Sequence, residues 1–159
     1  ADDTMDRATT PTELDDIEAA IDRWLGLQLA ENPVVAAVDR DTESGARRWF
    51  VRVHGEDKDV YSVWFTLGQR TLHYETYFMP APEENGEACY AHLLRRNASL
   101  YGLAFSIGAE DAVFLAGQLA NDAVSEDELD RILGTVYATV ELCFRAALRF
   151  GFASRFDPE

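Results

Sequence analysis

The fold of this chain is decided by residues 70–101, which read RTLHYETYFMPAPEENGEACYAHLLRRNASLY. Residues 70–79 alternate two sets of side chains, with Leu72 and Tyr74 in one set and His73 in the other. A period of two places the sets on opposite faces of a sheet, which is typical of a strand. Pro80-Ala-Pro82 ends this strand, because proline has no N–H to donate to a neighbouring strand.

A helix follows the two prolines. Glu83 and Glu84 suit the positive N-terminal end of a helix. Apolar residues then recur at helical spacing up to Tyr101. Gly102 is expected to end the helix, since glycine is the commonest residue just after a helix. The stretch therefore predicts a strand, a turn and a helix in succession.

The sequence before this stretch predicts a helix and two more strands. Thr10-Pro11-Thr12-Glu13 is a capping box with proline at the first helical position, and Asn32-Pro33 ends the helix that it starts. Residues 47–54 and 60–67 alternate as strands do and are separated by short turns. Together with residues 70–79 they predict an antiparallel three-strand meander.

Residues 34–38 are either a short strand or an extended lead-in to the sheet. After the middle helix, residues 103–107 and 112–119 predict two further strands. Residues 125–128 form a second capping box, which starts a long apolar helix that ends near Gly151. The predicted class is α+β, an antiparallel sheet of a three-strand meander plus two further strands packed with three helices. The order is α-β-β-β-α-β-β-α.

Alternation along the meander also assigns side chains to the two faces of the sheet. The inward set is Trp49, Val51, Val53, Tyr61, Val63, Phe65, Leu67, Leu72, Tyr74 and Phe78. The outward set carries three aromatic rings, which is more than a solvated face requires. We predict that this outward set binds a client protein or peptide segment: Phe50, Arg52, His54, Trp64, His73, Glu75 and Tyr77. The alternative is that a terminal segment or another helix covers it.

The middle helix has an apolar arc that is broader than packing on a sheet requires. We predict that part of it forms a homodimer interface, made of Tyr90, Leu93, Leu94, Asn97 and Tyr101. The alternative is a monomer that uses the whole arc internally. Asn97 lies within the arc, where it either satisfies a neighbouring backbone group or specifies the interface.

Length and charge limit the class of protein. A chain of 159 residues predicts one domain, which we place at residues 10–156, after a flexible acidic tail at residues 1–9. The net charge of −15 argues against binding to nucleic acid or to anionic membranes. It favours a partner that is basic, neutral or apolar where it touches the chain.

The sequence shows no long apolar run and no signal peptide, so a soluble cytoplasmic protein is expected. Cys89 and Cys143 lie in amphipathic segments and are expected to be buried free thiols.

No catalytic residue, cofactor or metal site is predicted. His73 and Glu75 lie two residues apart on one strand face, as a pair of metal ligands would, but no third ligand follows at a telling spacing. Cys89 and His92 lie three residues apart on a helix, which is typical of a core thiol beside a surface histidine. A phosphate-binding glycine loop and a nucleophile elbow are both absent from the sequence.

Several strings resemble the actinobacterial branch of the YbjN family, above all residues 49–59, 69–85 and 94–97. The resemblance covers about residues 12–156. It implies a fold like that of the type III secretion chaperones, with the same order of elements, and a role described as a sensory transduction regulator. Chaperones of that fold are small acidic homodimers that bind an extended client segment. The resemblance therefore favours a non-enzymatic binding or regulatory module, chaperone-like or an adaptor, over a small-molecule sensor or an enzyme with a pocket between sheet and helices.

Overall fold

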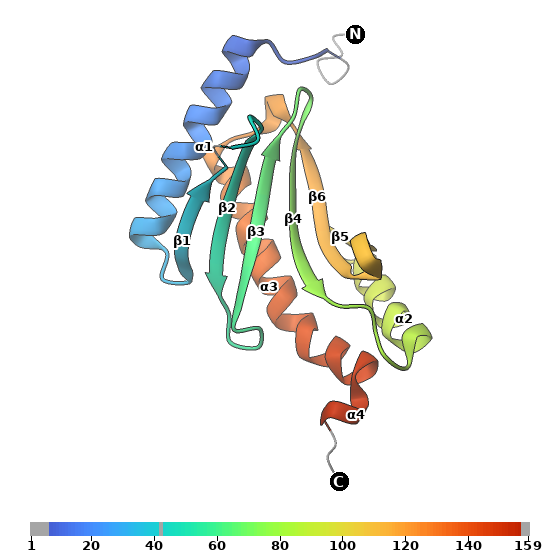
Figure 1. The fold of residues 1–159 in the computed structure, drawn as a ribbon. Helices are drawn as coiled ribbons and strands as arrows, with labels where there is room; N and C mark the ends of the chain where they lie inside the picture. The colour runs from blue at the N-terminus through green and yellow to red at the C-terminus, as the bar shows by residue number, and fades with distance from the viewer. Residues whose placement is uncertain (1–6, 42, 157–159) are drawn as a thin grey trace.

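The computed structural model describes residues 7–41 and 43–156, which fold into one sheet backed by helices (Figure 1). The elements in chain order are α1 (Pro11–Glu31), β1 (Val35–Arg40), β2 (Arg47–His54), β3 (Val60–Leu67), β4 (Thr71–Met79), α2 (Gly86–Asn97), β5 (Ala104–Ile107), η1 (Ala109–Asp111), β6 (Val113–Ala120), η2 (Asn121–Ala123), α3 (Glu126–Gly151) and α4 (Ala153–Phe156). The predicted α+β class and the antiparallel meander are confirmed.

The sheet has six strands in the order β1-β2-β3-β4-β6-β5, and all neighbours are antiparallel. The sixth strand is the segment that the sequence left open, because β1 pairs with β2 from Val35 to Arg40. In β6, Gly117 is required by close packing, since a Cβ there would lie 2.0 Å from the carbonyl oxygen of Gly102.

The core lies between the inner face of the sheet and the helices α1 and α3. Every residue of the predicted inward set is buried, with at most 6% of its surface exposed. Trp24 of α1 packs edge-on against Phe65, with ring centroids 5.9 Å apart. Burial of such large rings supplies much of the stability of a domain of this size.

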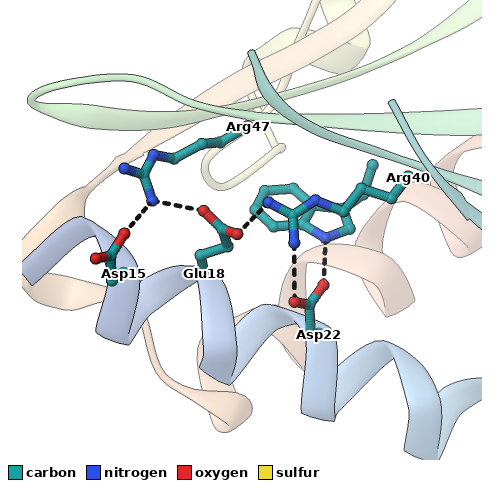
Figure 2. Close-up of polar contacts among 6 residues, drawn as sticks. Asp15, Glu18, Asp22, Arg40 and Arg47 are labelled. Carbon is teal, nitrogen blue, oxygen red and sulfur yellow. Dashed lines mark hydrogen bonds and ion pairs between the residues drawn. The ribbon is translucent and has the colours of Figure 1, made fainter. Parts of the chain in front are cut away.

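Charged side chains fix α1 over the first two strands (Figure 2). Asp15, Glu18 and Asp22 lie on one side of α1, as their spacing of three and four residues dictates. Arg47 pairs with Asp15 at 2.9 Å and with Glu18, while Arg40 pairs with Glu18 and with Asp22 at 3.0 Å. These side chains are only partly buried, so the pairs orient the helix more than they stabilise the fold.

The helix α2 is shorter than predicted at both ends. Asn85 has a left-handed φ of 53°, which a helix interior does not tolerate, so the helix begins at Gly86. The backbone N–H groups of Glu83 and Glu84 donate instead to the carbonyl oxygen of Gly151, at 2.8 and 3.1 Å. The other end stops at Asn97, and the chain turns at Gly102, whose φ is 73°. The prolines and the two glutamates therefore form a loop that binds the end of α3.

Both predicted N-caps are present. The Thr10 side chain accepts from the backbone of Glu13 in a complete capping box. At the start of α3 only half of the predicted box forms: the Ser125 side chain accepts from the backbone of Glu128, while the Glu128 carboxylate accepts from Arg131. Thr9 also joins the domain, because its N–H donates to the Gln69 carbonyl at 2.7 Å. The predicted tail thus ends before Thr9, and its residues 1–6 lie outside the described part of the chain.

Cys89 and Cys143 are buried free thiols, as predicted. In the stretch from residue 7 to 156, with residue 42 excepted, none of the helices combines the length and the apolarity that crossing a bilayer demands.

Candidate functional site

The outer face of the sheet is open over β2, β3 and β4. In Figure 1, α3 passes behind these strands and no helix lies in front of them. Trp64 is 43% exposed and Tyr77 is 46% exposed, while Arg52, His54 and His73 are exposed as well. Among residues 7–41 and 43–156, therefore, no helix or terminal segment covers this face.

Two aromatic pairs cross between neighbouring strands on the outer face. Phe50 of β2 lies directly opposite Trp64 of β3, with ring centroids 4.8 Å apart and planes at 88°. Tyr77 of β4 lies opposite Phe114 of β6, at 5.6 Å and 88°. Edge-to-face pairs of this kind hold each ring in one orientation, so the rings offer a firm apolar surface.

Phe114 is the part of this surface that the sequence reasoning missed. It lies in a short apolar strand, and only the pairing of β4 with β6 brings it beside Tyr77. Gly108 is also close to it, because a Cβ at Gly108 would lie 2.6 Å from the Phe114 ring. The sequence of 113–120, VFLAGQLA, does not alternate apolar and polar residues, so no local signal placed Phe114 on the outer face.

Polar groups surround the aromatic rings. Glu75 lies opposite Trp64 in the register of β3 and β4, and its carboxylate is 3.8 Å from the His73 ring nitrogen Nε2. Arg52 lies opposite Ser62 and forms no ion pair within residues 7–41 and 43–156. All seven predicted partner-binding residues thus lie on the outer face, with apolar rings beside one cation and one anion.

Lys58, the single lysine, fixes one end of this face. Its Nζ donates to the carbonyl oxygens of Tyr77 and Phe78 at 2.7 and 2.8 Å. The ammonium also lies 5.3 Å from the centre of the Tyr77 ring, within cation–π range. Burial lowers the pKa of Lys58 to about 8. Glu141 of α3 accepts from the backbone N–H groups of the same turn, so the turn is held against the core.

Among the described residues, few side chains are arranged to bind a metal ion or to act as a nucleophile. No group of three or more potential metal ligands occurs within the described ranges, so His73 and Glu75 stand as a pair. Burial raises the pKa of both the Cys89 and the Cys143 thiol, which favours the unreactive protonated form. Both thiols behave as core groups; Cys89 Sγ lies 3.6 Å from the Ala147 carbonyl oxygen.

The predicted interface residues, on α2 and just after it, divide into two groups. Leu93 is 2% exposed and belongs to the core, and Asn97 bonds the backbone of Phe105, which is the first of the two roles considered for it. Leu94 is 63% exposed, and the partly buried Tyr90 lines the same groove beside it. Tyr101, which follows α2, is 72% exposed. A small apolar groove of about 220 Å³ runs between Tyr90 and Leu94 on one side and β5 on the other.

Comparison with known proteins identifies relatives among mycobacteria. The uncharacterized protein Rv0487 of Mycobacterium tuberculosis is 38% identical over 109 residues, which are 69% of this chain and 60% of that protein. The uncharacterized protein ML2442 of Mycobacterium leprae is 31% identical over 115 residues, 72% of this chain and 62% of the relative. The chain thus spans about three fifths of the length of the relatives that it matches.

A solved structure shares the fold. It is the type III secretion chaperone SycH of Yersinia pestis, determined in complex with a stable fragment of YscM2. It superimposes with a TM-score of 0.50 at 16% identity, over 78% of this chain and 96% of that one. The predicted chaperone-like fold is therefore confirmed. The YbjN family, described as "Putative bacterial sensory transduction regulator", matches residues 14–149, and this chain belongs to that family.

Proposed function

We propose that this protein is a non-enzymatic binding module that holds an extended segment of a client protein on the outer face of its sheet and thereby regulates the client. The observation that carries the proposal is the open aromatic surface formed by Phe50, Trp64, Tyr77 and Phe114. Aromatic rings of fixed orientation are the usual anchors of protein interfaces. Arg52 and Glu75 provide one charge of each sign to set the register of the bound segment.

The comparisons support the same proposal. The family description is that of a regulator, and the structural neighbour SycH is a chaperone solved with a fragment of another protein. Fold similarity alone does not transfer a function, so the proposal depends on the aromatic surface. The two buried free thiols suit a reducing compartment, and we propose that the protein acts in the cytoplasm.

A second candidate is a small-molecule sensor. A cavity of about 420 Å³ lies between α1, α3 and β2, and its lining includes Val53, Leu133 and Tyr137. His73 and Glu75 do not line this cavity, because both side chains lie on the outer face of the sheet. Asp130 at the rim is already used, since it accepts from the Trp24 indole at 2.7 Å. A ligand there would be mainly apolar.

Client capture from the native host tests the main proposal. Wild type, Trp64→Ala and Tyr77→Ala are used as bait, and Leu142→Ala is the matched control, since Leu142 is 63% exposed on α3. A client held on the outer face should be captured by wild type and the control and lost from both aromatic variants. Peptides from the client should then change the fluorescence of Trp64, the most exposed indole. Equal capture by Trp64→Ala would overturn the proposal.

A further inference from the structure

The helix α2 presents a third face that neither the core nor the predicted interface uses. Cys89 and Leu93 point into the core. At about 100° per residue, Tyr90 and Leu94 lie on one side of that buried line, toward β5. Ala88, Ala91, His92, Arg95, Arg96 and Ser99 repeat at helical spacing on the other side. This third face remains accessible whether or not the first two are occupied.

The third face forms one wall of a groove of about 810 Å³. Two small residues, Ala88 and Ala91, line it on α2, and Phe150 lines it from α3. From Gly86 to Arg96 the groove follows the helix for about 15 Å, given a rise of 1.5 Å per residue. An extended peptide rises about 3.3 Å per residue, so about five residues would lie along it.

Two arginines in this groove have no partner. Many arginines of this acidic chain pair with carboxylates, as Arg40 and Arg47 do with Glu18, although Arg52 on the outer sheet face does not. The guanidinium groups of Arg95 and Arg96, by contrast, make no ion pair or hydrogen bond with the residues that the structure describes. Glu87, near the N-terminal end of α2, is the one carboxylate in the lining. Two unpaired cations in a chain of net charge −15 are a local reversal of sign.

His92 adds an unsatisfied polar atom beside the arginines. Its Nε2 is buried and has no hydrogen-bond partner, and its ring lies 5.4 Å from the Phe150 ring. Burial lowers the pKa of His92, and Arg96 and Arg95 lower it further. The N-cap, Asn85, makes no side-chain bond to the start of α2, so the positive helix end also lies open at the groove.

We infer that this groove binds an acidic peptide segment of a partner protein, whose carboxylates pair with Arg95 and Arg96. The length of the groove suits a short extended segment, and the small side chains of Ala88 and Ala91 let a backbone come close. Carboxylates pair with guanidinium groups in a matching planar geometry. Nucleic acid is disfavoured as the occupant, because the rest of the chain would repel its phosphates. This site is separate from the outer sheet face.

The three histidines allow the site to be tested in the full chain. His92 reports on the groove, whereas His54 and His73 lie on the outer sheet face. The protein, with isotope-labelled histidine, is titrated with a capped hexaglutamate peptide at low ionic strength and followed by NMR of the imidazole signals. We expect the His92 signal to shift to saturation while the His54 and His73 signals stay in place.

Charge variants supply the matched comparison. Replacing both Arg95 and Arg96 by Gln should raise the dissociation constant about tenfold, and Glu87→Gln should lower it. Arg52→Gln removes an unpaired arginine from the outer face and should leave the dissociation constant unchanged.

The inference is overturned if His92 shows no saturable shift, or if Arg52→Gln weakens binding as much as the Arg95 and Arg96 replacements do. It is also overturned if inorganic phosphate, added at the same total concentration of negative charge, binds as tightly as the hexaglutamate peptide. That result would show a general anion site. If the double variant unfolds, Glu87→Gln still tests the site, because it should change the dissociation constant in the opposite direction.

Discussion

Asn97 of α2 makes both side-chain hydrogen bonds to the backbone of one residue, Phe105 of β5. Its Nδ2 donates to the Phe105 carbonyl at 3.2 Å, and the Phe105 N–H donates to its Oδ1 at 2.7 Å. The amide thus takes the place of a neighbouring strand for this residue. It also joins α2 to the last strand of the sheet, whose outer edge has no other strand beside it in the described chain.

Asn97→Ala should lower the free energy of unfolding by roughly 1–3 kcal/mol, because it leaves a partly buried N–H and C=O without partners. Asn97→Asp should also destabilise, since a carboxylate would face the Phe105 carbonyl oxygen. The control is Ser106→Ala, at an exposed position of the same strand, which should change stability by less than about 0.5 kcal/mol. Denaturant unfolding measures all three, and an Asn97→Ala value as small as that of the control would contradict the role assigned to Asn97.

Trp64→Ala should cost little stability for a tryptophan, roughly 1–2 kcal/mol, because the side chain is 43% exposed and loses chiefly its contact with Phe50. Trp49→Ala is the comparison on the other face of the sheet. That indole is 1% exposed and donates to Asp22 at 2.7 Å, so its loss should cost roughly 3–5 kcal/mol. Thermal and denaturant unfolding give both values. Equal losses would mean that the outer face is covered after all.

Lys58 should titrate with a pKa of about 8, well below its ordinary 10.5, because burial disfavours the charged amine. Since Lys58 is the one lysine, a lysine carbon label gives a single signal whose titration can be followed by NMR. The unfolded chain holds this proton up to a higher pH than the folded chain does. The free energy of unfolding should therefore rise with pH between about 8 and 10.5 from this group. Lys58→Met should remove that rise, and a midpoint near 10.5 in the wild type would contradict the assignment.

We predict a homodimer that buries Tyr90, Leu94 and Tyr101 of two copies. Light scattering at tens of micromolar and moderate salt should give about twice the 17.8 kDa of one chain. Leu94→Asp or Tyr101→Asp should split the dimer. The matched control is Leu142→Asp, since Leu142 and Leu94 are both 63% exposed. A monomer mass for the wild type would reject the dimer.

Dialysis against a chelator should leave the melting temperature of the protein unchanged. His73 and Glu75 place two ligand types 3.8 Å apart on an open face, whereas a structural zinc site takes four ligands and couples directly to folding. Differential scanning fluorimetry before and after dialysis measures this. A fall of many degrees that added zinc restores would reveal a site that these two residues share with others.

The sequence by itself determined the α+β class, the meander, the two N-caps and the buried face of the sheet. Each of these depends on residues that are close in the chain. Leu72 and Tyr74 share a face because alternate strand residues do, and Thr10 caps a helix because its hydroxyl reaches the N–H of Glu13. Such local patterns act before any tertiary contact forms, so they can be read in order along the chain.

Only the tertiary structure decided which distant residues meet. The pairing of β4 with β6 brings Phe114 beside Tyr77 and completes the aromatic surface. The packing of α2 on α3 places Phe150 beside His92 and creates the groove with its two free arginines. Asn85 ended the predicted helix early, because the preceding loop bonds to Gly151 at the far end of α3. These contacts join segments far apart in the chain, and their energies depend on how whole elements pack rather than on local periodicity.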